Sequence, residues 1–352
     1  MLKRLFLHYV AEETRPMLRL AIPLVLAELG WMTMAIVDTM MVGRQAHSAE
    51  AIGAVSLGSI LFASAAIFGT GLMLGLDTLV SHSYGSGDIE DCHRSMVNGL
   101  YLCLAISPVL MGIIYLFERV LRHLNIPEPV LAQAIPYLRT LNWGTFPLLA
   151  FFVFRRYLQG MNLAKPVMFA LISANLVNLL GNWALIYGHL GFPAMGVRGS
   201  ALSTVFARIL MAASMLGFAW RYERKRGHPL FHHWAAPQVE RIQQLIRLGL
   251  PAAVQITLEV GAWNMATLSA GFLNPIALAT HQIALNYASV TYMVPLGISA
   301  AAAVSVGHAL GAGDKARARR AGWLAAGLGS GFMLLAGIAF FIVHRTRRRN
   351  GG

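Results

Sequence analysis

Long apolar segments alternate with short polar ones along the whole chain of 352 residues. A helix needs about 20 apolar residues to cross a bilayer core of about 30 Å. Nine segments meet this requirement, at about residues 17–42, 54–80, 95–117, 134–158, 165–188, 197–220, 243–270, 277–304 and 320–343. The fourth is the least regular, because Pro136 and Pro147 interrupt it. The pattern therefore predicts an all-α polytopic membrane protein with about nine transmembrane helices.

Two parts of this pattern are the same. Residues 20 to about 94 and residues 248 to about 320 each begin with Leu-x-x-Pro, contain two apolar runs and end in a glycine-containing loop. Residues 82–88 of the first loop align without a gap with residues 308–314 of the second. Six helices precede the restart, so the two units have the same orientation in the membrane. This is a parallel internal repeat, which is typical of secondary transporters with a central site between two halves.

The repeat also predicts the domain organisation. We expect a six-helix N-lobe at residues 1–220, a cytoplasmic linker at 221–241, a partial C-lobe of three helices at 242–344 and a basic tail at 345–352. Two complete six-helix lobes would hold twelve helices, so the C-lobe is expected to be incomplete. The tail would emerge outside with its arginines on the disfavoured side. A truncated or frame-shifted C-terminus explains this most simply; alternatively, the ninth helix does not cross fully.

The basic residues are distributed unevenly between the two sides of the membrane. The chain is 57% hydrophobic and 12% charged with a net charge of +13, whereas a soluble domain has about twice that share of charged residues. With the N-terminus in the cytoplasm, most basic residues fall inside, among them Arg155, Arg156 and the cluster at 221–226. The outside loops before the ninth helix hold only Arg44, Arg119, Arg122 and Arg198. This positive-inside bias orients a multi-pass protein and argues against nucleic-acid binding.

Enzymatic and metal-binding functions find little support. The linker histidines His228, His232 and His233 have no partner at metal-ligand spacing, and the glycines at 311–313 follow no strand and precede no Gly-Lys-Ser/Thr. We expect a protein that is not an enzyme and holds no transition metal or cofactor. Without an ATP-binding module, an ion gradient must supply the energy for transport.

Five segments carry a resemblance to a known family. Residues 36–43 resemble V-D-T-x-x-x-G, residues 76–85 resemble D-T-L-x-S-Q-x-Y-G with His82 in place of Gln, and residues 159–166 resemble Q-G-x-x-x-x-x-P. Residues 178–188 and 281–295 resemble the fifth and eighth helices of the same family. These motifs occur in the family's order and spacing up to about residue 340. The chain is therefore similar to the multidrug and toxic compound extrusion (MATE) transporters, in their bacterial NorM-type branch.

The resemblance implies a twelve-helix protein of two six-helix lobes. It would export small cationic amphipathic drugs or toxic compounds across the bacterial inner membrane in exchange for Na⁺ or H⁺. Its partners would be these compounds and membrane lipid, and we expect a monomer unless copies complement the missing helices. Two alternatives remain: a non-transporting truncated remnant, and a lipid-linked sugar flippase of a related superfamily. The flippase would line its cavity with arginines, for which Arg208 is the candidate.

Asp38 is the strongest candidate for the coupling site. A carboxylate inside a membrane helix costs several kcal/mol unless it is paired, hydrated or protonated, so its presence suggests a use. Asn178 and Asn182 lie four residues apart and share one helix face. Their carbonyls, pointing at Asp38, would complete an oxygen-rich cation site or a proton-linked network. The alternatives are an interfacial Asp held by a helix end and asparagines that only join helices.

Further polar residues extend this prediction. Glu259 in the seventh helix is expected to bind the coupling ion or to attract a cationic drug, unless it pairs structurally with Gln282 or His281. Gln282 and Tyr292 are expected to contact substrate. Glu28 lies ten residues before Asp38, about 15 Å along the helix, and could line the same cavity at another depth.

Three residues are predicted to act in gating. Asp77, near the inner end of the second helix, is expected to organise the gate through loop amides or arginines. Pro23 and Pro251 occupy equivalent positions in the repeat, and each is expected to kink its helix for alternating access. The alternative for both prolines is a place in the first helical turn, where proline costs little.

Overall fold

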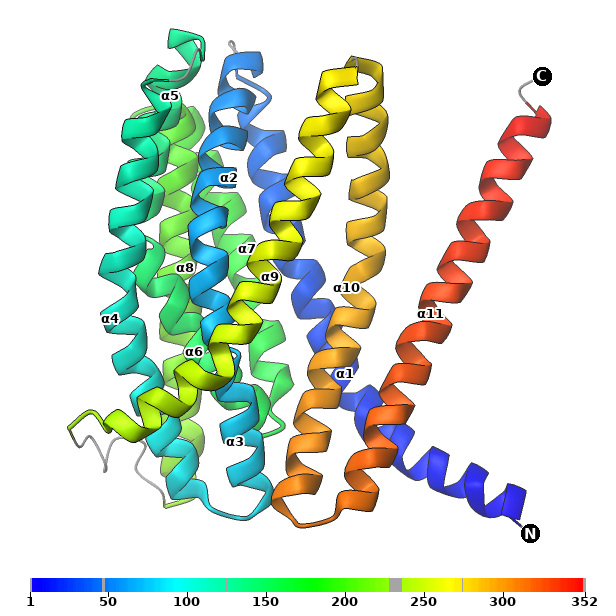
Figure 1. Ribbon diagram of the computed structural model, residues 1–352. Helices are drawn as coiled ribbons and strands as arrows, with labels where there is room; N and C mark the ends of the chain where they lie inside the picture. Colours follow the sequence, from blue (N-terminus) through cyan, green and yellow to red (C-terminus); the bar gives the residue numbers. More distant parts are fainter. Residues whose placement is uncertain (1, 46–47, 124–125, 228–235, 274, 351–352) are drawn as a thin grey trace.

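The computed structural model describes every residue except 1, 46–47, 124–125, 228–235, 274 and 351–352. The described residues form helices and no strand, as a bilayer requires of apolar segments that must satisfy their own backbone hydrogen bonds. The helices, shown in Figure 1, are α1 (Leu2–Val42), α2 (Ser48–Leu72), α3 (Gly75–Gly85), α4 (Ile89–Leu121), α5 (Glu128–Asn142), α6 (Thr145–Gly160), α7 (Ala164–Tyr187), α8 (Gly196–Lys225), α9 (Val239–Leu273), α10 (Pro275–Gly311) and α11 (Lys315–Asn350).

Eight of the predicted spans match helical segments that are long and apolar enough to cross a membrane within the described part of the chain. One of them combines α2 and α3, with a break at Met73 and Leu74 where a single helix is expected. The remaining span, the fourth at 134–158, is wrong as one helix, because it breaks at Trp143 and Gly144 into α5 and α6. Pro147 explains this break: it lies in the first turn of α6, where no backbone donor is needed.

The helices form two unequal groups. Following the predicted organisation, we call α1 to α8 the N-lobe and α9 to α11 the C-lobe. Helix α9 packs against α2 and α10 against α1, whereas α11 diverges from the bundle along most of its length (Figure 1). Figure 1 also shows the α3–α4 and α10–α11 loops side by side at one end of the molecule, here called the loop end. At this end α11 buries Ala318, Ala321 and Ala325, the last two in a core that it shares with α1 and α10.

The two loops at the loop end confirm the internal repeat. Gly87 and Gly313 take left-handed backbone conformations, with φ of 82° and 77°, which glycine adopts without steric cost. Asp88 and Asp314 then accept hydrogen bonds from the backbone three residues later, at 2.9 and 2.8 Å. These are N-caps of the next helix in each unit. Both loops therefore have the same conformation because they have the same sequence pattern.

The lobes contact each other through equivalent glycines. A β-carbon on Gly85 would overlap the backbone of His308, and a β-carbon on Gly311 would overlap the backbone of His82. The two contacts exchange when the repeat units are exchanged. An approximate two-fold axis therefore passes between the loops.

A second pair of contacts follows the same symmetry farther from the loops. Gly71 of α2 lies against Ala253 of α9, and Gly297 of α10 lies against Val25 of α1. The absence of a side chain allows the backbones to approach closely, as small residues do between membrane helices. The lobes thus join along a surface that each repeat unit supplies in the same way.

Candidate functional site

Asp38 lies where α1, α7 and α8 meet. It is only 6% exposed. Its carboxylate accepts a hydrogen bond from Asn182 Nδ2 at 2.5 Å and another from Thr204 Oγ1 at 3.0 Å. No basic side chain in the described part of the chain forms an ion pair with it. Asp38 is therefore a buried acid held by neutral donors.

The surrounding helices are fixed by their own contacts. Tyr187 of α7 donates to the carbonyl of Met41 at 2.7 Å, and Asn175 donates to the carbonyl of Gly30 at 2.9 Å, so α7 is held against α1 at two levels. On its other side, α7 approaches α8 at Gly181, where a β-carbon would overlap the side chain of Ser203. The close packing brings Asn182 and Thr204 to the same carboxylate.

The structure brings the predicted asparagines together with Asp38, but in another orientation. The amide nitrogen of Asn182 faces the carboxylate of Asp38 and donates to it, which is the orientation that suits an ionised carboxylate. Asn178 Oδ1 accepts from Asn182 Nδ2 at 3.3 Å, and Asn182 Oδ1 is buried without a partner. The prediction that both carbonyls point at Asp38 is therefore wrong for this arrangement. Their role in ion binding stays a prediction.

Asp38 borders a cavity of about 420 Å³ inside the N-lobe. This volume falls in the range of small-molecule sites, about 300–1,000 Å³. Most of the lining is apolar or aromatic, and it includes Trp31, Met34, Val55, Phe62, Tyr137 and Phe152. The charged groups on its wall are Asp38 and Arg208.

Arg208 is the second charge of the cavity. It is 7% exposed, and its guanidinium carbon lies 4.3 Å from the centre of the Phe62 ring. Its Nε and Nη1 are buried without a hydrogen-bond partner in the described residues. Among the described residues this arginine thus has an aromatic contact and lies within electrostatic range of Asp38, but it has no hydrogen-bonded carboxylate or carbonyl partner.

Glu28 does not line this cavity, so the prediction that it does so together with Asp38 is wrong. Instead it forms an ion pair with Arg155 of α6. Arg156 of the same helix pairs with Asp77 at 3.0 Å. Both arginines therefore lie in the helix bundle and not in a cytoplasmic loop. The arginine partner predicted for Asp77 is present, but it lies on a helix. These four charges neutralise one another in the interior, which buried charges require.

Phe152 lies against both arginines and also against the cavity. The Phe152 ring lies 5.5 Å from the guanidinium carbon of Arg155 and 5.9 Å from that of Arg156. Phe152 also lines the cavity and contacts Trp31 edge to face, with ring centres 5.8 Å apart. Asp38 and Glu28 consequently lie in two distinct polar environments on the same helix.

The predicted C-lobe residues lie outside this cavity. Glu259, Gln282 and Tyr292 are exposed on α9 and α10, with Tyr292 within electrostatic range of Glu259. Among the described residues Glu259 forms no hydrogen bond to Gln282 or His281, and the His281 ring instead lies 3.2 Å from Thr267 Oγ1. The suggested structural pairing of Glu259 is therefore not found.

The repeat prolines lie well inside their helices. α1 continues through Pro23 and α9 through Pro251, so the first-turn alternative is wrong for both. Each proline removes one backbone donor from a long helix. Kinking for alternating access stays a prediction.

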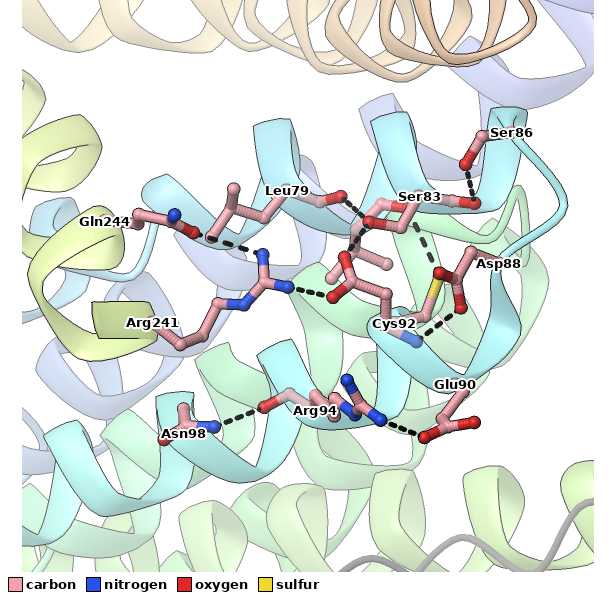
Figure 2. Close-up of polar contacts among 12 residues, drawn as sticks. Leu79, Ser83, Ser86, Asp88, Glu90, Cys92, Arg94, Asn98, Arg241 and Gln244 are labelled. Atoms are coloured by element: carbon pink, nitrogen blue, oxygen red, sulfur yellow. Dashed lines mark hydrogen bonds and ion pairs between the residues drawn. The ribbon is translucent and has the colours of Figure 1, made fainter. Parts of the chain in front are cut away.

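Polar contacts at the loop end, which the sequence pattern did not indicate, fasten α9 to the N-lobe. Arg241 of α9 forms an ion pair with Asp91, which also accepts from Ser83 Oγ at 2.6 Å (Figure 2). Asn98 Oδ1 accepts from the backbone of Gln238 at 2.8 Å. The contacts of Arg241 and Gln238 join residues 150 and 140 positions apart in the sequence, so local spacing gives no signal for them.

A metal centre is not apparent in the part of the chain that the structure describes: no group of three or more His, Cys, Asp or Glu residues is placed to hold an ion. The linker histidines His228, His232 and His233 lie outside the described residues.

Comparison with known proteins agrees with this architecture. The MatE family model matches residues 23–184 and 251–346. A probable multidrug resistance protein NorM of Mesorhizobium japonicum is 36% identical over 334 residues, covering 94% of this chain and 71% of that protein. The multidrug resistance protein MdtK of Yersinia pseudotuberculosis is 34% identical over 336 residues, covering 95% and 72%.

Solved structures show the same fold. One is the outward-facing conformation of a multidrug resistance MATE family transporter of the MOP superfamily, with a TM-score of 0.83, 20% identity and coverage of 95% of this chain and 73% of that one. Another is a MATE protein in complex with MaD3S, with a TM-score of 0.81, 22% identity and coverage of 94% and 73%. The family model matches most of the chain in two segments, and each segment begins at the proline of one repeat unit, Pro23 or Pro251. The chain belongs to the MatE family.

Proposed function

We propose that this protein is a cation-coupled antiporter that exports small cationic amphipathic compounds across the bacterial inner membrane, with its N-terminus in the cytoplasm. One observation carries the proposal. Asp38 is a buried carboxylate without an ion-pair partner among the described residues, and it borders an apolar cavity of about 420 Å³. Family membership and the multidrug resistance names of its relatives support the same function.

The geometry suggests how exchange works. A single carboxylate in an apolar site is costly when ionised and unpaired, and either a coupling ion or a cationic compound relieves that cost. The coupling ion and the compound compete for the same carboxylate, so binding of Na⁺ or H⁺ lowers the affinity of the site for the compound. If the two sides of the membrane are exposed in turn, this competition becomes antiport, because each ligand shifts the conformational equilibrium by its differential affinity. Apolar walls make few directional demands, which suits several substrates.

The C-lobe has a subsidiary role in this proposal. Glu259 is exposed on α9, within electrostatic range of Tyr292 and outside the Asp38 cavity. We propose that it attracts cationic compounds to the space between the lobes and that Gln282 and Tyr292 contact them there, while Asp38 couples transport to the ion. No cofactor beyond the coupling ion is required, and the proposed unit is a monomer.

The flippase alternative is less consistent with the cavity. A site for a lipid-linked pyrophosphate would need several cationic side chains, whereas Arg208 is the cationic side chain of the lining and an aspartate shares the wall with it. The composition of the lining therefore favours export of small amphipathic compounds.

Ethidium efflux from energised cells that lack their own pumps tests the proposal. Cells expressing this chain should lose ethidium faster than cells with empty vector. Collapse of one of the two gradients, the proton gradient or the sodium gradient, should abolish this difference in efflux rate. The gradient that matters identifies the coupling ion. Efflux equal to that of empty vector, with the chain shown to be in the membrane, would contradict the proposal and favour a non-transporting remnant.

A further inference from the structure

We infer that the ion pair between Arg241 and Asp91 is a reversible latch, which holds the two lobes together at the loop end and must open to expose the site to that side. The inference rests on the proposed function, which requires the two sides of the membrane to be exposed in turn. The proposed orientation puts the loop end in the cytoplasm. Arg241 and Asp91 then set the balance between a state closed toward the cytoplasm and a state open toward it.

The lobes contact each other at the loop end and much less toward the opposite end. Leu245 and Ala253 in the first half of α9 are buried, whereas the described side chains from 261 to 273 are exposed or half-buried. The close contacts at Gly85 and Gly311 also lie at the loop end (Figure 1). Exposure of the site to the cytoplasm therefore requires that contacts at this end break.

Each charge of the pair is held in position by its own lobe. Asp91 lies in the first turn of α4 and accepts a hydrogen bond from Ser83 Oγ of α3 at 2.6 Å. Arg241 lies in the first turn of α9 and donates a second bond to Gln244 of the same helix at 3.2 Å (Figure 2). Groups that are already fixed lose little conformational freedom when they meet, which strengthens their contact. The two lobes therefore present a prepared donor and a prepared acceptor to each other.

The exposure of the pair suits a contact that opens and closes. The side chains of Arg241 and Asp91 are 18% and 21% exposed, against 2% and 13% for Arg155 and Glu28 within the N-lobe. Charges near the surface regain water when they separate, whereas a charge in the interior stays unpaired when it loses its partner. The pair of Arg155 therefore stabilises the N-lobe, while the pair of Arg241 can break without that cost.

The symmetric joining of the lobes does not require this ion pair. Continued without a gap, the alignment of residues 82–88 with 308–314 places Ala309 opposite Ser83 and Arg317 opposite Asp91. The second unit thus has neither the acceptor nor the hydroxyl that orients it at these positions. The glycine contacts occur in both units, but the ion pair is added to one of them, at the place where the lobes must part.

Pulsed electron paramagnetic resonance on the full chain in lipid nanodiscs tests the latch. Spin labels on Ser86→Cys and Ala312→Cys, at equivalent exposed positions of the two loops, report the distance between the lobes at the loop end. Labels on the exposed positions Ala49→Cys and Leu273→Cys report it at the opposite end. The two native cysteines are buried, and the chain without added cysteines measures any label that they take up.

The wild-type chain should show mainly one short distance at the loop end. Arg241→Gln and Asp91→Asn should each raise the ratio of a second, longer distance to the short one about tenfold, as expected for the loss of a hydrogen bond between charged groups, and the labels at the opposite end should approach each other. The double variant should open no further than either single variant, because both changes remove the same contact. Arg94→Gln, which removes an ion pair within α4, should change neither distance.

Unchanged loop-end distances in both single variants, an additive effect in the double variant, or an equal change in Arg94→Gln would overturn the latch. Lengthening at the loop end without approach at the other end would also overturn it, because that is local loosening and not alternation. A retained short distance shows that a variant is folded; if Arg241→Gln does not fold, Asp91→Asn decides by the same ratio. The distances are measured without substrate or gradient, so a failed latch leaves the proposed function standing, and absent ethidium efflux counts against that function alone.

Discussion

The N-lobe and the C-lobe are built on one repeat, but they differ in how much of their surface the protein covers. In the apolar spans of the N-lobe, 28% to 44% of the most apolar stretch is buried in the protein within the described residues. In the C-lobe the share is 33% in α10, which packs against α1, but only 17% in α9 and 6% in α11. Exposure of apolar side chains costs nothing in lipid, whereas a polar side chain there needs a partner. The N-lobe therefore offers more buried positions for polar side chains than α9 and α11 do.

The positions of the charged residues reflect this difference in burial, and they do not recur at equivalent positions of the two repeat units. The spacing that pairs Pro23 with Pro251 also pairs Trp31 with Glu259, and it pairs Asp38 with an alanine, Ala266. The glycine contacts between the lobes, by contrast, obey the repeat closely. The repeat therefore determines how the lobes join. The site around Asp38, by contrast, is formed by residues of the N-lobe alone.

The largest effect on stability is expected from Arg155→Met in the N-lobe. Removing this arginine leaves Glu28 as an unpaired charge in the bundle, which costs about 3–5 kcal/mol of the free energy of unfolding. Unfolding by SDS in mixed micelles measures this loss. The matched change in the C-lobe, Arg247→Met, removes an exposed arginine and should stay within about 0.5 kcal/mol. Similar losses in both variants would mean that the two lobes do not differ in buried charge.

Gly85→Ala and Gly311→Ala should each lower the free energy of unfolding by about 1–3 kcal/mol, because the new methyl group forces two backbones apart. Symmetry predicts equal losses in the two variants, measured by the same titration. Gly112→Ala on α4 is the control, since a β-carbon there meets open space and alanine favours the helix. Clearly unequal losses at positions 85 and 311 would show that the lobes do not join symmetrically.

The smallest effect is expected from Thr204→Val, which removes one hydrogen bond to Asp38 and keeps the side-chain shape. One hydrogen bond is worth about 1 kcal/mol, or about fivefold in the apparent affinity for the coupling ion. Thr257→Val in the C-lobe removes only a bond to its own helix backbone and should leave this affinity unchanged. The ion dependence of ethidium efflux measures both. An equal change in the apparent ion affinity of the two variants would show that Thr204 does not contribute to the ion site.

Much of the architecture could be predicted from local pattern. Membrane spans need long apolar segments and repeats preserve their spacing, so the order of helices and the parallel repeat follow from the sequence. The meeting of Asp38 with Asn182 was also accessible, because a buried carboxylate and two asparagines on one helix face both need polar partners. The sequence did not indicate which amide atom faces the carboxylate, since that depends on the charge state of Asp38.

The remaining parts of the site depend on long-range contacts. Arg155 lies near the end of an apolar segment, so its position suggested a loop, but its partner Glu28 is on α1 and draws it into the bundle. Thr204 has no distinguishing pattern around it and becomes a donor to Asp38 only because α7 and α8 pack at Gly181. Pairing between distant helices determines these roles, and one sequence does not encode it in local spacing.

Asp38→Asn and Glu259→Gln distinguish ion coupling in the N-lobe from ion coupling in the C-lobe. Both variants would be reconstituted in vesicles and assayed for ethidium movement driven by an imposed proton or sodium gradient. Asp38→Asn is expected to abolish gradient-driven movement, whereas Glu259→Gln should retain it with a several-fold weaker apparent affinity for ethidium. Retained gradient-driven transport in Asp38→Asn, with its loss in Glu259→Gln, would contradict the assignment of coupling to the N-lobe.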